Sequence, residues 1–125
     1  MPKFDDALRG YAHEVLKRDG FCCRYCGLDG STSLSAWLSL SWDHLLPKGH
    51  AERDNPKFIV AACMFCNTAD NHYFRKAAAR GLSFDGLSPG DLVELRRPFV
   101  EATRSAYREF WEANVRDDGV QQSTG

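Results

Sequence analysis

The first part of the chain alternates hydrophobic and polar positions with the period of a helix. Apolar residues recur at steps of three or four, at Phe4, Leu8, Tyr11, Ala12, Val15 and Leu16. This spacing predicts a helix from about residue 5 to residue 18, with Asp5 or Asp6 available to cap its start. The Asp19-Gly20 pair marks its expected end.

From residue 34 the period changes to two. The apolar residues Leu34, Ala36, Leu38, Leu40 and Trp42 alternate with a mostly serine face. Such alternation predicts a strand over residues 34–42, bent or forming one arm of a hairpin. A loop is expected from Pro47 to about residue 57. The short apolar run of residues 58–62 follows it and leads into a pair of cysteines.

The second half of the chain has a mostly helical pattern. We expect one helix over residues 67–80, ended by Gly81. Ser88-Pro89 is a favourable helix start, because proline suits the first helical position. Pro98 is predicted to break or kink that element.

A longer helix is predicted to follow and to end near residue 116. Its residues Val100, Tyr107, Phe110 and Trp111 are expected to pack on the body of the protein, with an aromatic contact between two copies as the alternative. Trp37 and Trp42 are assigned to the core, and residues 117–125 to a flexible tail. The prediction is a single α+β domain over residues 1–116, with its central motif over about 15–75 and C-terminal helices over about 88–116.

Composition narrows the class of protein. The 125 residues are 43% hydrophobic and 26% charged, which is ordinary for a globular domain and excludes a collagen-like or low-complexity chain. No apolar run approaches the roughly 20 residues needed to cross a bilayer, and the N-terminus has no apolar signal core. We therefore expect no membrane partner and a cytoplasmic location. Since the net charge is −1, contacts with nucleic acid would have to come from a local basic patch.

Four of the five cysteines form two C-x-x-C pairs, Cys23–Cys26 and Cys63–Cys66. Each short turn can place two sulfurs on one side, and two such turns can complete a tetrahedral zinc site. With four protein ligands the zinc would be structural and would close the two ends of the intervening segment on each other. The alternative is buried, reduced thiols at chance spacing. Cys22 either packs or is free, and a redox switch that uses this spare thiol is a third, weaker hypothesis.

An Asp-His pair lies between the cysteine turns, where the predicted strand ends. The carboxylate of Asp43 can hold a hard divalent cation, and a neutral His44 imidazole can take a proton from water. Asn67 begins the helix expected after the second turn, and Asn71 lies one turn later on the same face. An amide oxygen there could complete the coordination of the cation. By itself, an Asp-His pair is also common in surface turns.

Together these residues resemble the HNH endonucleases of the four-cysteine type. The resemblance covers about residues 15–75, in Arg18–Phe21, Cys23–Gly27, Asp43-His44 with Pro47 and Gly49, and Ala62–Asn67. It implies a ββα-metal fold, a structural Zn²⁺, and a catalytic Mg²⁺ or similar divalent cation. It also implies hydrolysis of phosphodiester bonds in DNA, or in RNA. By this resemblance His44 is the general base, and Asp43 and Asn67 are the ligands of the catalytic cation.

Two positions depart from the family pattern. Phe58 replaces the asparagine that steadies the loop carrying the base, and Asn55 could substitute for it only in a shifted loop. Asp70 replaces a frequent lysine. These departures motivate an alternative function, a catalytically impaired zinc module of the same fold that binds nucleic acid or a protein. His50 and His72 are either further ligands or exposed side chains.

Basic residues in three places are candidates for phosphate contacts. Lys48 follows the Asp-His pair, and Arg75 and Lys76 lie on the helix expected after the second cysteine turn. Further candidates are Arg80 and the C-terminal residues Arg96, Arg97, Arg104 and Arg108. The alternative is a solvated face in which the C-terminal arginines mix with Glu101, Glu109 and Glu112. The pattern fits a monomer or a homodimer.

Overall fold

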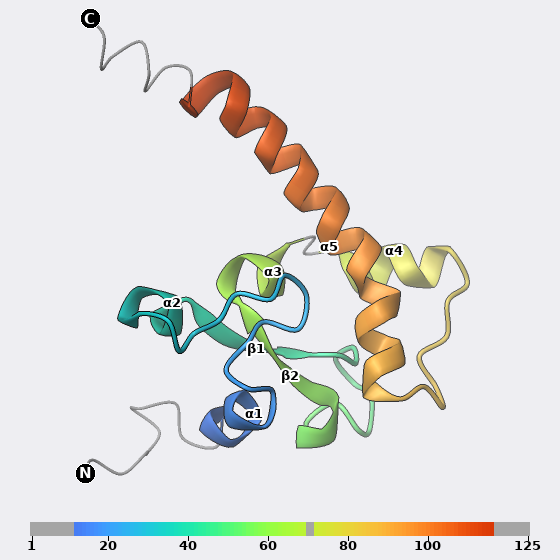
Figure 1. Ribbon diagram of the computed structural model, residues 1–125. Helices are drawn as coiled ribbons and strands as arrows, with labels where there is room; N and C mark the ends of the chain where they lie inside the picture. Colours follow the sequence, from blue (N-terminus) through green and yellow to red (C-terminus); the bar gives the residue numbers. More distant parts are fainter. Residues whose placement is uncertain (1–11, 70–71, 117–125) are drawn as a thin grey trace, which may run out of the picture.

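The protein is described here by a computed structural model, which covers residues 12–69 and 72–116 and combines one small sheet with several helices (Figure 1). In chain order the elements are α1 (Ala12–Arg18), α2 (Leu34–Leu38), β1 (Leu40–His44), the 3-10 turn η2 (Pro56–Phe58), β2 (Ile59–Cys63), α3 (Met64–Thr68), α4 (Tyr73–Ala79), α5 (Pro89–Trp111) and its π-helical continuation η3 (Glu112–Arg116). The predicted α+β class is confirmed.

Strands β1 and β2 form an antiparallel pair. Leu40 lies opposite Cys63, and His44 lies opposite Ile59. The chain passes from β2 into α3 without a loop, because the Cys63 side chain accepts the backbone N–H of Cys66 and caps the helix. Strand, strand and helix therefore follow one another around the second pair of cysteines.

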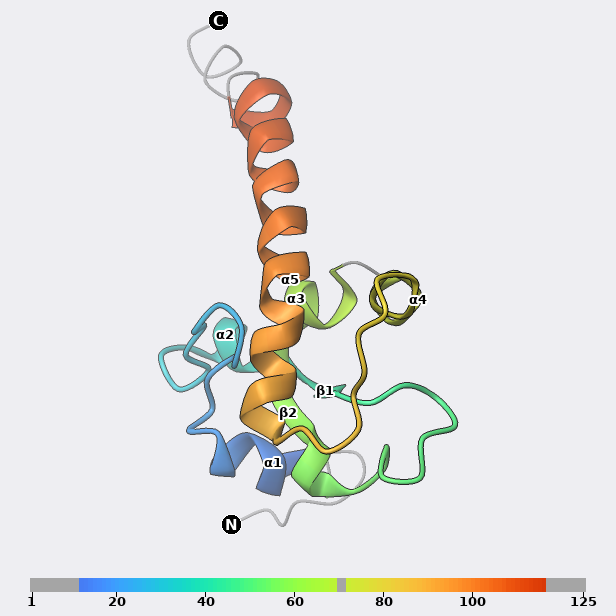
Figure 2. The same cartoon turned by 90° about the vertical axis from the view of Figure 1, so that its right-hand side faces the viewer.

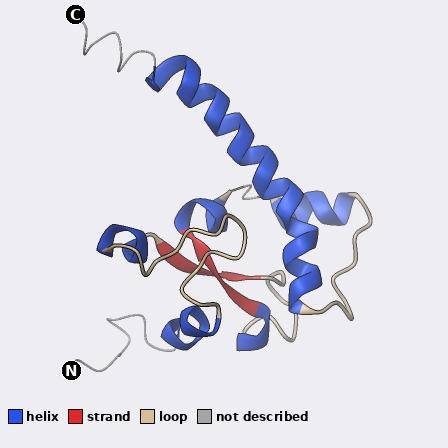
Figure 3. Cartoon of the chain, viewed as in Figure 1, coloured by secondary structure: helices blue, strands red, loops and turns tan. Residues whose placement is uncertain are grey.

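Strand β2 is buried on both faces, which explains its continuous apolar sequence. Val60 belongs to the main core, together with Leu92 and Val93 of α5. Its neighbour Ala61 belongs to a second core with Leu16 of α1. Because neighbouring side chains of a strand point to opposite faces, β2 joins these two cores. Figure 3 shows the sheet lying among the helices.

The predicted strand over residues 34–42 is wrong in its first half. Residues Leu34–Leu38 form helix α2, whose start is capped by Ser33 Oγ at 3.0 Å from the backbone nitrogen of Ala36. The leucines at the two ends of α2 are exposed, so the alternating pattern does not mark a buried face there. Serine is a strong N-cap, and this local bond explains the helix.

The two tryptophans assigned to the core are only partly buried. Trp37 lies on α2 and Trp42 in β1, and both have intermediate exposure. The largest fully buried side chains among the described residues are instead aliphatic, including Leu16, Leu40 and Leu46.

The single helix predicted over residues 67–80 is two helices. Helix α3 begins at Met64, inside the second cysteine pair, and ends at Thr68. Helix α4 starts again at Tyr73. Residues 70 and 71 lie outside the described part of the chain, so the positions of Asp70 and Asn71 are not assigned.

Helix α5 runs through Pro98 without a break. It starts at Ser88, whose Oγ accepts the backbone N–H of Asp91 at 3.1 Å. Leu92, Val93 and Val100 are buried on both sides of the proline, and this packing holds the helix together where one backbone hydrogen bond is lost. Figure 1 shows the ribbon changing direction in its N-terminal half, as expected for a kink.

The C-terminal half of α5 projects from the body (Figures 1 and 2). The predicted burial of Val100 is confirmed, but that of the three aromatic residues is wrong. Tyr107 and Phe110 are each 63% exposed and Trp111 is 45% exposed. Phe65 of α3 meets the ring of Tyr107 edge-on, with centroids 5.1 Å apart, but this contact leaves all three aromatic residues exposed. Across the described residues, no helix combines the length and the apolar character required to cross a membrane.

Candidate metal centre and adjoining hollow

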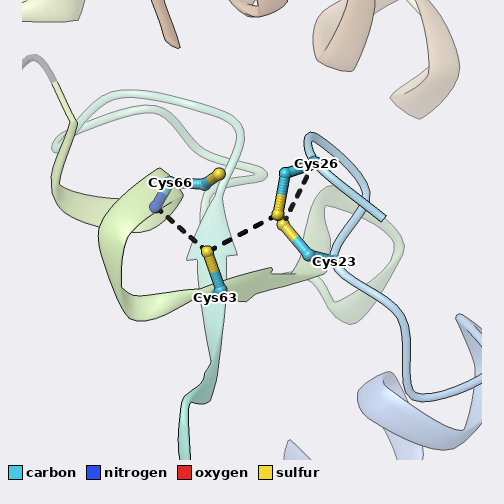
Figure 4. Close-up of side chains that lie close together, drawn as sticks. All are labelled: Cys23, Cys26, Cys63 and Cys66. Carbon is cyan, nitrogen blue, oxygen red and sulfur yellow. Dashed lines mark hydrogen bonds between the residues drawn. The ribbon is translucent and has the colours of Figure 1, made fainter. Parts of the chain in front are cut away.

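The four paired cysteines come together in space (Figure 4). Cys23 and Cys26 lie on the loop after α1, whereas Cys63 ends β2 and Cys66 lies in α3. All four sulfurs lie within 4.8 Å of one another, and the Cys26 and Cys63 sulfurs are 3.8 Å apart. Zinc-thiolate bonds of about 2.3 Å in a tetrahedron place sulfurs about 3.8 Å apart. The cluster could therefore hold a metal ion such as zinc.

Backbone geometry prepares both cysteine turns. The N–H of Cys26 donates to Cys23 Sγ at 3.5 Å, and the N–H of Cys66 donates to Cys63 Sγ at 3.4 Å. Gly27 closes the first turn with a φ of 79°, a left-handed conformation that suits glycine. These N–H groups stabilise thiolates, the form of cysteine that binds metals.

Crowding of the sulfurs separates their pKa values. The neighbouring thiols of Cys63 and Cys66 lower the pKa of Cys23. In turn Cys23 raises the pKa of Cys66 and of Cys63. One thiolate thus opposes ionisation of its neighbours Cys63 and Cys66, and a bound cation would offset this opposition.

Two arginines of α5, Arg97 and Arg104, bond to the cysteine turns. Arg97 donates from Nη1 to the carbonyl of Tyr25 at 2.7 Å and from Nη2 to that of Arg24 at 3.1 Å. Arg104 Nη2 donates to Cys66 Sγ at 3.2 Å, and the thiol raises the pKa of Arg104. The helix therefore supports the cluster from the side opposite α1.

Cys22 lies outside the cluster. Its thiol donates to the carbonyl of Gly20 at 3.4 Å, and the residue is half-buried. It pairs with Asp29 in an isolated β-bridge. The packing alternative for this cysteine is therefore supported.

Asp43 is buried at the end of β1 and pairs with two residues from distant segments. Its Oδ2 accepts the Tyr25 hydroxyl at 2.7 Å and Arg96 Nη1 at 2.6 Å. Tyr25 lies between Cys23 and Cys26, so the first cysteine turn directly positions this carboxylate. Arg96 reaches it from α5 and also donates to the backbone carbonyl of Asn67 at 3.1 Å.

Burial and the neighbouring charge have opposite effects on the pKa values of Asp43 and Arg96. Burial raises the pKa of the Asp43 carboxyl, while the Arg96 guanidinium and the Tyr25 hydroxyl oppose that rise. Burial by itself would lower the pKa of Arg96, but the Asp43 carboxylate, together with Tyr25 and Tyr73, outweighs burial and the pKa rises. Burial raises the pKa of Tyr25. Arg96 is therefore a cation, and it is placed to keep Asp43 ionised.

Asp43, His44 and Asn67 line one hollow of about 220 Å³, here called the His44 hollow. Arg53 and Tyr73 line the same hollow. The structure thus brings together the three residues that the sequence singles out, from the end of β1 and from α3. Asn67 donates from Nδ2 to Ser41 Oγ and to the carbonyl of Trp42, both at 3.2 Å. The oxygen of the Asn67 side-chain amide takes no part in these two hydrogen bonds.

His44 is suited to accept a proton. Its side chain is 25% exposed, and its Nε2 lies 3.6 Å from Asp54 Oδ1. Burial, followed by the charge of Arg53, lowers the pKa of His44. The imidazole is therefore mostly neutral near pH 7.

The basic residues predicted to touch phosphate are exposed. Lys48 follows β1 in the loop, and Arg75 and Lys76 lie on α4, whose first residues Tyr73 and Phe74 line the His44 hollow. This arrangement leaves their predicted role open.

The loop after β1 is held by local contacts. Phe58 packs against the main core, and its carbonyl accepts the N–H of Leu45 at 2.9 Å. Asn55 caps η2 through the N–H of Lys57 at 3.0 Å and donates to Glu52 at 2.8 Å. Asn55 therefore orders this loop without occupying the position of Phe58.

The two histidines that are alternative ligands, His50 and His72, do not line the His44 hollow. His50 pairs with Asp85 at 3.2 Å, and exposed His72 precedes α4.

Sequence reasoning missed Tyr25 and Arg53 near the hollow, and it considered Arg96 only for a phosphate contact. A tyrosine between two cysteines has a hydroxyl that must find a partner when buried, and this signal could have indicated Tyr25. Arg96 and Arg53 carry no local pattern that marks them. Their roles depend on the contact between α5, the loop and β1.

Comparisons of the chain with protein-family models, with curated proteins and with solved structures gave no match.

Proposed function

We propose that this protein is a metal-dependent endonuclease of the HNH type that hydrolyses phosphodiester bonds in DNA. The observation that supports this most is the shared hollow of Asp43, His44 and Asn67 next to the four-cysteine cluster. The order of β1, β2 and α3 around this site is compatible with a ββα-metal fold.

In this proposal the cysteine cluster holds a structural zinc. All four donors are sulfur, which zinc accepts in closed tetrahedral sites. The cluster ties the loop after α1 to the junction of β2 and α3. Because Tyr25 stands inside the first cysteine turn, the zinc would also keep the Asp43 carboxylate in place.

Asp43 and Asn67 are the residues that would hold the second, catalytic cation. Their donor set fits a hard ion, since both offer oxygen. Asp43 binds Tyr25 and Arg96 through Oδ2, and Asn67 turns its amide nitrogen toward β1. Mg²⁺ or a similar ion, when bound, would stabilise negative charge on the phosphate and on the leaving oxygen.

His44 would act as the general base. Its neutral imidazole takes a proton from water while the water oxygen bonds to phosphorus and the bond to the leaving sugar oxygen breaks. Arg53 adds positive charge at the wall of the hollow. Lys48, Arg75 and Lys76 would contact neighbouring phosphates and position the strand.

The test is cleavage of supercoiled plasmid by the zinc-loaded protein with Mg²⁺, Mn²⁺ or EDTA. Nicking that requires the divalent ion and disappears in His44→Ala is the expected result. His50→Ala is the matched control, because His50 lies outside the hollow, and it should cleave like the parent. Equal nicking by parent and His44→Ala would show that His44 is not the base.

A second candidate is a zinc module of the same architecture that binds nucleic acid or a protein without cleaving. The favouring observation is that the Asp43 carboxylate is buried and already bonded to Tyr25 and Arg96. Its expected result is DNA binding that is the same in parent and His44→Ala, with no cleavage under any metal. Single-stranded RNA added as a second substrate separates this outcome from a nuclease with another preference.

A further inference from the structure

Two histidines of this protein, His44 and His50, each have an aspartate beside Nε2. His44 Nε2 lies 3.6 Å from Asp54 Oδ1, and His50 Nε2 lies 3.2 Å from Asp85 Oδ1. The pairs also match in exposure, since each imidazole is 25% exposed and the two carboxylates are 85% and 86% exposed. The two pairs can therefore be compared directly.

The second ring nitrogen distinguishes the two histidines. His50 Nδ1 accepts the backbone N–H of Glu52 at 3.1 Å, so in the neutral ring Nε2 carries the proton and donates to Asp85. Both nitrogens of His50 are thus engaged. Among the described residues, none forms a hydrogen bond with Nδ1 of His44, which lines the hollow. His44 therefore keeps one ring nitrogen for a further partner.

Asp54 is held beside His44 by the loop that contains it. The backbone N–H groups of Arg53 and Asn55, on either side of Asp54, donate to backbone carbonyls of the same loop at 3.1 and 3.0 Å. Asn55 also caps η2 through its side chain. Arg53 Nη1 donates at 3.2 Å to the same Asp54 oxygen that faces His44. Backbone turns and a neighbouring cation thus place this carboxylate, although its side chain is exposed.

A carboxylate beside one ring nitrogen determines the tautomer of an imidazole. An ionised carboxylate only accepts hydrogen bonds, so the ring nitrogen next to it carries the proton. For His44 this places the proton on Nε2 and the lone pair on Nδ1. The separation of 3.6 Å exceeds a hydrogen bond, but contacts of this kind often shorten when a substrate binds.

We infer that Asp54 is the positioning residue of the general base, holding His44 with its proton on Nε2 and leaving Nδ1 to take the proton of water. This inference rests on the proposed nuclease function. It also gives the loop that carries the base a support of its own, although Phe58 replaces the asparagine of the family pattern.

The first test measures the ring of His44 without reference to cleavage. Nitrogen-15 nuclear magnetic resonance of the zinc-loaded protein, at roughly pH 8 where histidine is neutral, distinguishes a proton on Nε2 from one on Nδ1. The parent should have the proton on Nε2. Asp54→Ala should raise the fraction with the proton on Nδ1 about two- to five-fold, the range expected when an exposed charged contact is lost.

The matched control is Asp85→Ala, which removes an equally exposed carboxylate from the other histidine and should leave the His44 spectrum unchanged. Asp54→Glu keeps the carboxylate and should restore the spectrum of the parent. Zinc content and far-ultraviolet circular dichroism confirm that each variant is folded. The same His44 tautomer populations in the parent and in Asp54→Ala would overturn the inference.

The second test is plasmid nicking by the same proteins with Mg²⁺. Asp54→Ala should nick about ten-fold more slowly than the parent, which is part of the roughly 10²- to 10⁴-fold that a general base contributes. Asp54→Glu should recover most of the rate, and Asp85→Ala should nick like the parent. Equal rates for the parent and Asp54→Ala, or equal losses in Asp54→Ala and Asp85→Ala, would also overturn the inference.

The two tests separate this inference from the function on which it rests. A parent that does not nick any substrate overturns the proposed function and the part of Asp54 in catalysis. The nitrogen-15 spectra then still decide whether Asp54 orients the His44 ring. A parent that nicks, with an Asp54→Ala variant that changes neither tautomer nor rate, overturns the inference and leaves the proposed function in place.

Discussion

The cysteine cluster and the His44 hollow lie next to each other but differ in the chemistry of their side chains and in their exposure to solvent. The cluster consists of four sulfurs, three of them on buried residues, and its ligands come from two short turns. The hollow is lined by oxygen and nitrogen side chains and stays open to solvent. Its residues come from β1, the following loop, α3, α4 and α5.

Tyr25 joins the two regions. Its backbone belongs to the first cysteine turn, and its hydroxyl is bonded to Asp43. The difference between the two sites therefore indicates a division of roles, in which the closed cluster fixes the position of a residue that lines the open hollow. This division leads to four predictions.

The largest effect is expected from removing half of the cluster. Replacement of Cys63 and Cys66 by serine should abolish zinc binding and the cooperative thermal transition. Structural zinc contributes about 10–16 kcal/mol in small domains, which matches or exceeds the total stability of about 5–15 kcal/mol typical of a folded domain. Zinc stoichiometry and a calorimetric scan measure the result.

Cys22→Ser is the control for that experiment, because this thiol lies outside the cluster. It should keep both zinc and the transition of the parent. A serine double variant that still melts cooperatively would show that the fold does not need the cluster.

The next largest effect should come from the buried ion pair. Arg96→Met leaves the Asp43 carboxylate buried without its counter-ion, which typically costs about 3–5 kcal/mol. The zinc should remain bound, because no cysteine contact is lost. Urea unfolding of the zinc-loaded protein gives the free energy of unfolding.

Two companion variants sharpen the measurement. Arg108→Met, on the exposed part of α5, should change stability by less than about 0.5 kcal/mol. Arg96→Met combined with Asp43→Asn should recover part of the loss, since it removes the unpaired charge. Equal stability of the Arg96 and Arg108 variants would argue against a role for the ion pair.

A smaller loss is expected for Tyr25→Phe, which keeps the ring in the core but removes the bond to Asp43. Hydrogen bonds to charged groups contribute about 1.5–3 kcal/mol, and zinc content should not change. Tyr107→Phe is the matched control, since Tyr107 is exposed. A Tyr25→Phe protein as stable as this control would uncouple the cluster from the hollow.

The smallest effect concerns the titration of His44. Burial and the charge of Arg53 lower its pKa below the usual 6.5, so the folded protein binds fewer protons here than the unfolded chain. This contribution to stability is present above pH 6.5 and is lost as the pH falls through the folded pKa. Nuclear magnetic resonance titration of the zinc-loaded protein, without other divalent ions, reports the pKa directly.

Arg53→Gln should move that pKa upward, because it removes one of the two causes of the shift. A titration of His44 at or above 6.5 in the parent would contradict the environment described for the hollow.

Local sequence predicted the features that depend on few neighbours. The two C-x-x-C pairs converge as expected, because a turn of that length places both sulfurs on one side. The apolar run before Cys63 is a strand, and Ser88 and Pro89 begin a helix. Asp43, His44 and Asn67 share a hollow as the resemblance implies, although their chemistry remains a proposal.

Predictions failed where a distant contact or a single cap overrides the periodic pattern. The alternation from Leu34 fits a strand, but the bond from Ser33 favours a helical turn. Of the two alternatives predicted at Pro98, the break is absent and the kink is present, because the packing on both sides keeps α5 continuous. The aromatic residues of α5 have the spacing of a buried face, yet the contact of Tyr107 with Phe65 of α3 leaves all three exposed.

The sequence by itself therefore determined the two pairs of cysteines that form the cluster, the identity of the titratable side chains and most of the elements, since these depend on bonds and steric limits within a few residues. Only the tertiary structure decided that Arg96 is buried against Asp43, that Arg97 and Arg104 hold the cysteine turns, and that half of α5 is uncovered. The physical reason is that burial and charge pairing depend on which segments are in contact in the folded protein. When two residues are separated by dozens of positions, no local sequence pattern indicates that they will be in contact.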